Sequence, residues 1–250
     1  VIMEIVRFEP SMASKWDDFV SRDPEADIFH HAAWSSIIAN SSPLKSKYLC
    51  AIQNDEIVGV LPLVYTVSPI FGKNLISTPF CMRGGPLGIT EVKQALLESA
   101  MELGRELGVG TIEIRAPSTI EGGVEVSDRH CYFTKAISPD NDENLKAIPR
   151  KQRAVVRKGI KAGLVGRKED SLDNFFTIYS TSVRNHGTPI FSRDYFVQLK
   201  ELLGDACEIT TVFKDDEPLS SVMSFRFRNV IMPYYGGGLP EARHNKAFDF

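Results

Sequence analysis

The sequence contains no hydrophobic run long enough to cross a membrane. Its longest apolar run, residues 57–65, is interrupted by Gly59 and Pro62 and falls far short of the roughly 20 residues that a transmembrane helix needs. The first eight residues alternate apolar and charged side chains and lack the apolar stretch and small-residue cleavage site of a signal peptide. We therefore expect no transmembrane segment and a cytoplasmic protein.

Cysteines are few, and none forms the close pairs typical of zinc knuckles or redox motifs. The four are scattered: Cys50, Cys81, Cys131 and Cys207. We expect them to be reduced, and mostly buried. His30 and His31 are adjacent, so on a helix their side chains point about 100° apart and do not form a metal-binding pair. The sequence indicates no metal site.

Several catalytic signatures are also absent. There is no Gly-x-Ser-x-Gly elbow, no His-Glu-x-x-His motif, no Walker lysine loop and no dinucleotide fingerprint, which argues against hydrolases, metalloproteases and kinases. Hydrophobic residues make up 43% and charged residues 24% of the chain, as in ordinary globular proteins. With 250 residues, the chain is long enough for two domains of about 120 residues each.

Positive charge is concentrated in one segment of an acidic chain. The formal net charge is -3, yet residues 145–168 contain nine lysines and arginines and no acid. Arg150, Arg153, Arg157 and Lys161 recur at helical spacing, which predicts an amphipathic helix with a cationic stripe. Such a stripe suits phosphate, because arginine offers a planar fork of donors and lysine a point charge. A solvated helix face, or a strut whose arginines pair with acids, is the alternative.

The chain also contains a repeated layout. Residues 48–65 read as a hairpin with an acidic turn, and 161 positions later residues 209–227 read the same way. The acidic turns Asp55-Glu56 and Asp216-Glu217 superpose at that offset. A helical stretch with a similar residue triplet precedes each hairpin. A duplication explains this pattern, although hairpins in general share turn chemistry.

Both halves therefore read as mixed α/β modules in which antiparallel strands lead into a helix. We expect helices at 91–107, 172–184 and 194–203, with strands at 111–116, 131–135 and 230–235. A glycine-rich turn, Gly236 to Gly238, and a helix near Ala247 are expected to follow the last strand. We predict a first domain at 1–140, a linking basic helix at 141–168, and a second domain at 169–250 that is incomplete at its C-terminus, since the chain ends where a helix starts.

Four motifs carry a resemblance to a known family. They are Phe29 to Trp34, the basic stretch 149–163, Arg184 to Pro189, and Tyr234 to Gly238 with Glu241 to Arg243. Together they resemble the FemAB-like proteins, whose fold consists of two tandem domains of the Gcn5-related N-acetyltransferase (GNAT) type. The similarity is greatest to FemAB-related proteins associated with exosortase and exopolysaccharide systems. The resemblance implies mixed, mostly antiparallel sheets flanked by helices.

The resemblance also implies an activity, namely transfer of an acyl or aminoacyl group onto an amine of a cell-envelope or exopolysaccharide precursor. Aminoacyl-tRNA or acyl-CoA would be the donor co-substrate, with no tightly bound cofactor. The expected partners are a phosphorylated small molecule or a lipid- or nucleotide-linked precursor, and tRNA. Relatives that bind muropeptide carry a lysine shortly after the tryptophan, whereas Ser35 and Ser36 follow Trp34 here, which leaves the acceptor open. The alternative is a non-catalytic module that binds a nucleotide sugar or RNA.

We name candidate residues on this basis. Tyr235 is a candidate catalytic residue, whose hydroxyl would donate a proton or orient the acceptor. Tyr234 and Tyr235 alternate across a strand, so only one of them can face a cleft, and the sequence does not decide which. His186 is a candidate general base; aromatic packing and a structural histidine are the alternatives. The glycine segment is a candidate for ligand approach to the backbone, or simply a strand-ending turn. The candidate substrate-binding residues are Arg150, Lys151, Arg153, Arg157, Lys158, Lys161, Arg184, Asn185, Tyr234, Gly236, Gly237, Arg243 and, in the first half, Arg83.

Overall fold

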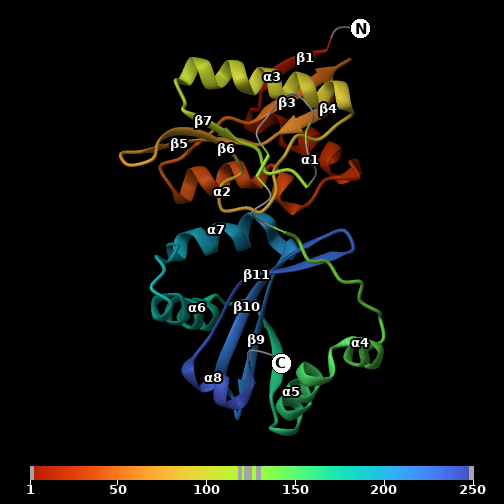
Figure 1. The fold of residues 1–250 in the computed structure, drawn as a ribbon, viewed down its shortest axis with the longest axis vertical. Helices are drawn as coiled ribbons and strands as arrows, with labels where there is room; N and C mark the ends of the chain where they lie inside the picture. Colours follow the sequence, from red (N-terminus) through yellow and green to blue (C-terminus); the bar gives the residue numbers. More distant parts are fainter. Residues whose placement is uncertain (1–2, 118–119, 121–125, 128–130, 248–250) are drawn as a thin grey trace. The chain divides into compact units, whose positions relative to one another are not determined.

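The computed structural model of the chain describes residues 3–117, 120, 126–127 and 131–247. The chain divides into two compact units, Val1–Val126 and Ser127–Phe250, and each combines strands with helices (Figure 1). No helix among the described residues is both long and apolar enough to span a bilayer.

The first unit contains two sheets, of strand order β1-β3-β4 and β2-β5-β6-β7. All their pairings are antiparallel except the parallel pair β6 and β7. Helix α3 packs Leu96 and Leu103 against buried leucines of both sheets. The elements are β1 (Glu4–Arg7), η1 (Pro10–Met12), α1 (Ala13–Arg22), η2 (Ile28–His30), α2 (Ala33–Ser41), β2 (Lys45–Ser46), β3 (Leu49–Gln53), β4 (Glu56–Leu61), β5 (Leu63–Ser68), β6 (Gly72–Ser77), α3 (Thr90–Leu107) and β7 (Thr111–Glu113).

The second unit contains one antiparallel sheet of strand order β11-β10-β9-β8. Helix α6 packs on β10 and β11 through an aromatic core that includes Phe175, Phe196 and Tyr235, while Ala242 of α8 packs with Leu219. The elements are α4 (Asn141–Ala147), α5 (Arg150–Lys161), β8 (Val165–Glu169), α6 (Asp173–Asn185), α7 (Arg193–Leu203), η3 (Gly204–Ala206), β9 (Cys207–Lys214), β10 (Glu217–Phe227), β11 (Val230–Gly238) and α8 (Pro240–Asn245).

Two predictions about strands were wrong. Residues 131–135 form no strand; they are exposed, and Phe133 leaves 91% of its surface to solvent. Aromatic residues favour a strand only where a neighbouring strand and a core give them something to pack against. The glycines Gly236 to Gly238 do not form a turn either, because β11 continues through them and pairs with β10 as far as Gly238.

The two predicted hairpins form, and their turns have the same geometry. Asn54 and Asp55 have φ values of 52° and 62°, and Asp215 and Asp216 have 50° and 65°. Consecutive positive φ angles suit the right-handed twist of a two-residue hairpin, and Asn and Asp tolerate them best after glycine. The two acidic turns therefore reverse the chain with the same backbone conformation in both units.

The register of pairing repeats as well, at the offset of 161 seen in the sequence. The pair Ile52 with Ile57 recurs as Phe213 with Pro218, and both hairpins then skip one residue of the second strand before pairing resumes. The pairing of β1 with β3 likewise recurs in β8 with β9. A shared bulge and a shared register across these strands confirm the duplication.

The units diverge after these hairpins. In the first unit Pro62 separates β4 from β5, which belong to different sheets, whereas β10 runs without interruption. Thirteen residues separate the paired Leu63 and Ser77, but only eight separate Ser224 from Pro233. The β5–β6 hairpin is therefore longer than its counterpart in the second unit.

Candidate functional site

Helix α5 gathers the predicted phosphate-binding residues into one open groove. It begins after Pro149 and ends before Ala162, and its spacing of three and four residues brings side chains to a common face. The groove has a volume of about 470 Å³. It is lined by Arg150, Arg153, Ala154, Arg157, Lys158 and Lys161. Of the six predicted cations on this helix, only Lys151 does not line the groove.

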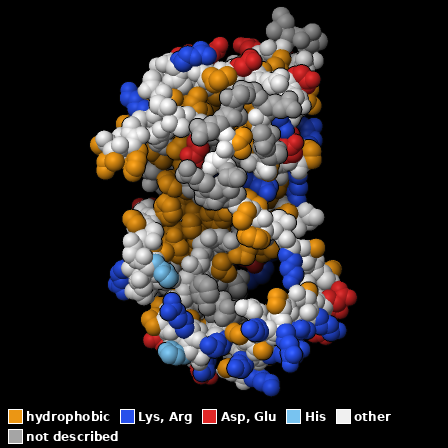
Figure 2. Space-filling model, in the orientation of Figure 1, with side chains coloured by type: hydrophobic (Ala, Val, Ile, Leu, Met, Phe, Trp, Pro, Cys, Tyr) orange, Lys and Arg blue, Asp and Glu red, His pale blue; other side chains and the backbone are white. Residues whose placement is uncertain are grey.

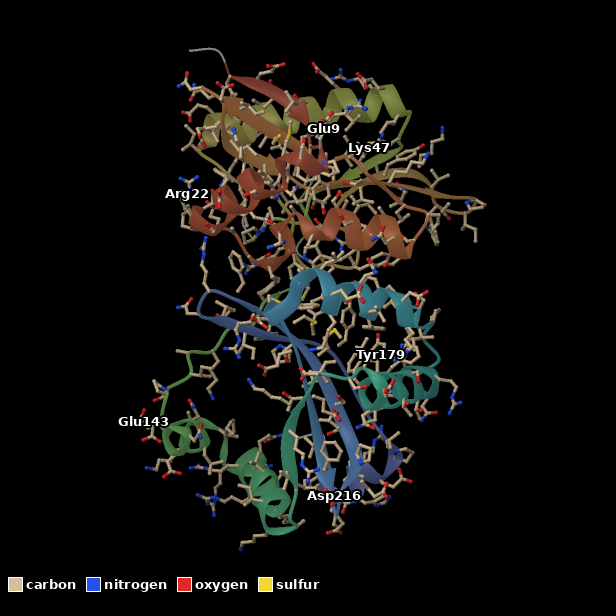
Figure 3. All side chains as sticks on the ribbon, turned by 180° about the vertical axis from the view of Figure 1, so that it is seen from behind. Glu9, Arg22, Lys47, Glu143, Tyr179 and Asp216 are labelled. Atoms are coloured by element: carbon tan, nitrogen blue, oxygen red, sulfur yellow. The ribbon has the colours of Figure 1, made fainter. Side chains whose placement is uncertain are left out.

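The cations of this groove have no carboxylate partner among the described residues. Two other cations of the basic segment do. Arg167 contacts Asp216 at 2.7 Å and Lys168 contacts Glu208 at 2.5 Å; Figure 3 labels Asp216 at the turn between β9 and β10. The hydrogen bond from Lys168 lowers the pKa of Glu208. The described residues therefore give no support to α5 as a strut held by carboxylates.

The end of β11 contains the two predicted tyrosines. Tyr235 pairs with Met223 and Pro233 pairs with Ser224, so Tyr234 is the extra residue of a bulge. Tyr235 is buried, and its hydroxyl lies 2.9 Å from the hydroxyl of Tyr195. It belongs to the aromatic core beneath α6 and α7, whereas Tyr234 is half-buried.

The glycines that follow differ from each other in their surroundings. A Cβ atom on Gly237 would lie 2.7 Å from the Cβ atom of Ser182 and 3.2 Å from the Cα atom of Tyr179. Gly237 therefore lets α6 approach β11 closely. Figure 3 labels Tyr179 on this helix. Gly236 is exposed, and the nearest atom to its added Cβ would lie 3.5 Å away. Of these two glycines, only Gly236 has room for a ligand beside it.

A second groove lies at the C-terminal end of α6. It has a volume of about 480 Å³ and is lined by Ser180, Thr181, Arg184, Gly187, Thr188, Pro189 and Ile190. Arg184 is thus the predicted residue that reaches this groove. Asn185 and His186 are exposed beside it but do not line it, and the His186 imidazole has no hydrogen-bond partner among the described residues. Arg243 is exposed on α8.

The candidate Arg83 belongs to the first unit, whereas the other candidate residues belong to the second. Its Nε lies 3.7 Å from Oδ2 of Asp27, which caps η2. His30 is buried in the same region, with Nε2 3.1 Å from the Gly85 carbonyl oxygen. Burial raises the pKa of the neighbouring Cys81 thiol well above its ordinary value. This is a packed polar cluster around the segment that contains Arg83.

Sequence reasoning missed Tyr195 and the residues of the second groove that lie outside the motif Arg184 to Pro189, namely Ser180, Thr181 and Ile190. The repeat offers a signal for Tyr195, since the offset of 161 aligns it with Trp34, and both are buried in the first turn of a helix. No comparable signal marks Thr181 or Ile190. No group of three or more potential metal ligands is found in the described ranges.

Residues 145–248 match the family of acetyltransferase (GNAT) domains. The match includes α5, both grooves and the end of β11, but not Arg83. A comparison with curated proteins gives no match. The part of the chain that is similar to GNAT-type acetyltransferase domains therefore lies in the second unit.

Solved structures extend the similarity to nearly the whole chain. The crystal structure of FemX is 15% identical, has a TM-score of 0.71, and is matched over 98% of this chain and 83% of that chain. The C-terminal domain of a putative lysylphosphatidylglycerol synthetase from Agrobacterium fabrum is 12% identical, with a TM-score of 0.53 and coverage of 96% and 72%. The chain has the FemAB-like fold of tandem GNAT domains that the motifs predicted, and these findings support an acyltransferase.

Proposed function

We propose that the protein is an N-acyltransferase that moves an acyl or aminoacyl group onto an amine of a cell-envelope or exopolysaccharide precursor in the cytoplasm. One observation carries this proposal: five cations without carboxylate partners among the described residues line a single groove of α5, inside the segment that matches the acetyltransferase domain. Arginines at exposed, unneutralised positions are well suited to phosphate, which they can bind through two parallel hydrogen bonds.

The groove suits either proposed donor, because acyl-CoA and aminoacyl-tRNA both carry several phosphates. The match to an acetyltransferase domain favours acyl-CoA. The structural similarity to a protein named as a lysylphosphatidylglycerol synthetase favours an aminoacyl group instead. Either donor is a co-substrate that leaves after the reaction, and a phosphorylated or lipid- or nucleotide-linked precursor would accept the acyl group.

The proposed chemistry takes place at the end of β11. Acyl transfer to an amine requires hydrogen-bond donors for the developing oxyanion and a group that removes a proton from the amine. Exposed Gly236 lets a substrate carbonyl approach the backbone closely. We propose that His186 is the general base that removes a proton from the amine. As the C–S bond of acyl-CoA or the ester C–O bond of aminoacyl-tRNA breaks, the Tyr235 hydroxyl protonates the leaving thiolate or ribose oxygen, with Tyr195 holding that hydroxyl in place.

Binding of tRNA and of CoA by the full chain, measured over a range of salt concentrations, tests the phosphate groove. Arg153→Gln combined with Arg157→Gln should weaken tRNA binding at least about tenfold and reduce the salt slope by about one for each phosphate that the variant no longer neutralises. Arg167→Gln combined with Lys168→Gln is the matched control, because those cations are already paired with carboxylates. Equal binding by the groove variant and the wild type would refute the phosphate groove.

A radiolabelled transfer assay then separates enzyme from binding module. The proposal predicts an acylated amine from acyl-CoA or aminoacyl-tRNA, with kcat lowered by Tyr235→Phe, which keeps the ring, and by His186→Ala. Tight, salt-sensitive binding of RNA or a nucleotide sugar without any acyl product would favour the non-catalytic alternative. Unchanged kcat in both variants would leave those two residues with structural roles only.

A further inference from the structure

The tip of the β5–β6 hairpin exposes apolar side chains to solvent. Ile70 is 84% exposed, Phe71 is 79% exposed and Val67 is 61% exposed. Figure 1 shows this hairpin projecting from the rest of its unit, and Figure 2 shows hydrophobic side chains gathered at its end. Single exposed apolar residues are common on protein surfaces, but consecutive ones at a projecting tip call for an explanation.

The backbone of this tip is held in place by the hairpin itself. The Ser68 hydroxyl accepts hydrogen bonds from the backbone N–H groups of Ile70 and Phe71, both at 3.2 Å. The Asn74 side chain donates to the Phe71 carbonyl oxygen at 3.2 Å, and Gly72 takes a positive φ of 71°. These hydrogen bonds fix a turn in which both apolar side chains stay exposed.

Among the described residues, the tip contributes no side chain to the buried core cluster of its unit. The core contacts of the hairpin lie at its base, where Leu63 and Leu75 are fully buried. The corresponding hairpin of the second unit is five residues shorter between equivalent paired positions. The extension therefore adds an exposed apolar end without adding to the core.

The charge around the tip is positive. Residues 57–90 contain no acid. Lys73 pairs with Val67 across the hairpin. Lys45 of β2 pairs with Tyr65, two residues before Val67 on β5. Lys47, labelled in Figure 3, lies nearer the base of the hairpin, where its backbone N–H donates to the Leu63 carbonyl oxygen. None of these three lysines forms an ion pair with a carboxylate in the part of the chain that the structure describes.

We propose that this hairpin tip docks the protein onto a membrane surface that contains anionic lipids. Ile70 and Phe71 would enter the boundary between headgroups and acyl chains, and the lysines behind them would lie among the headgroups. The long lysine stem lets the ammonium group remain in water while its methylenes cover apolar surface. A narrow tip offers far less than the roughly 800 Å² per partner that a stable protein interface buries, which favours a bilayer over a protein.

Flotation of the full chain with vesicles tests this proposal, which does not depend on the acyltransferase activity. The wild type should bind phosphatidylcholine vesicles that contain phosphatidylglycerol and should bind pure phosphatidylcholine more weakly. Ile70→Asp combined with Phe71→Asp should lower partitioning at least about tenfold. Lys45→Gln and Lys73→Gln should each lower it about fivefold, on anionic vesicles only.

Phe133→Asp is the matched control, because Phe133 is even more exposed but lies outside the hairpin. A second readout uses Phe71→Trp: Trp16 and Trp34 are fully buried, so a blue shift of emission on adding anionic vesicles reports entry of the tip. The proposal fails if the wild type does not float, if the tip variant floats equally well, or if Phe133→Asp lowers binding as much. If the wild type does not bind vesicles but forms an oligomer that the tip variant does not form, the partner is instead a second copy of this chain.

Discussion

Replacement of Gly237 by alanine should destabilise the second unit. The added Cβ would lie 2.7 Å from the Cβ of Ser182 and 3.2 Å from the Cα of Tyr179, and neither atom belongs to a flexible side-chain end. Helix α6 must therefore shift away from β11, which disturbs the aromatic core beneath it. Forcing extra volume into a packed interior typically costs about 1–3 kcal/mol, and we expect Gly237→Ala to fall in that range.

The neighbouring glycine provides the control. Gly236→Ala places its Cβ 3.5 Å from the nearest atom, an ordinary contact, at a backbone conformation outside the positive-φ region. Removing a glycine there restricts the unfolded chain, so the variant should be as stable as the wild type or more stable by up to about 1 kcal/mol. Ser182→Gly removes the contacted Cβ and should recover part of the stability when combined with Gly237→Ala.

Urea unfolding followed by far-ultraviolet circular dichroism measures these differences. Hydrogen exchange of the α6 amides then shows whether the destabilisation lies in this part of the second unit. The reasoning would be refuted if Gly237→Ala were as stable as Gly236→Ala, or if exchange in α6 did not change. A loss of activity at unchanged stability would instead assign Gly237 to substrate binding, as the sequence suggested.

Three further outcomes are expected. Burial raises the pKa of the Cys207 thiol to about 12, whereas Cys131 is exposed. A maleimide at neutral pH should therefore label Cys131 first, and Cys131→Ser should abolish this fast phase of labelling. The Lys168 hydrogen bond lowers the pKa of Glu208, so Glu208→Gln should be less stable than the wild type at neutral pH, with the gap in melting temperature closing as the pH falls below 4.5. Tyr235→Phe removes the hydrogen bond between two buried phenols and should cost about 0.5–1.5 kcal/mol in urea unfolding.

Local chemistry made the hairpins and α5 predictable. The pairs Asn54-Asp55 and Asp215-Asp216 define their turns through backbone preferences of the residues themselves, and the cationic period of α5 is visible in the sequence. The strand through Gly236 and Gly237 was not predictable in this way. Gly237 is required by a helix packed on the sheet from elsewhere in the chain, whereas glycine alone indicates a turn.

The distinction between paired and unpaired cations also depended on the fold. Nine basic residues look alike in the segment 145–168. Strand pairing with β9 brings Arg167 and Lys168 within reach of Asp216 and Glu208, whereas α5 leaves its own cations without such neighbours in the described ranges. Only the three-dimensional arrangement separates an ion-paired strand from a groove open to an anion.

A difference between the duplicated units favours the second as the place of acyl transfer. Gly237 pairs with Ser221 on β10, and the position equivalent to Ser221 in the first unit is Val60, which is bridged by Leu87. There the chain leaves β6 after Ser77, and the segment that leads to Leu87 is held by hydrogen bonds such as that between His30 and the Gly85 carbonyl oxygen. In the second unit the equivalent position pairs with a glycine of β11, and the neighbouring Gly236 is exposed. If acyl transfer takes place at this strand end, we therefore expect it in the second unit, which also contains the segment similar to acetyltransferase domains.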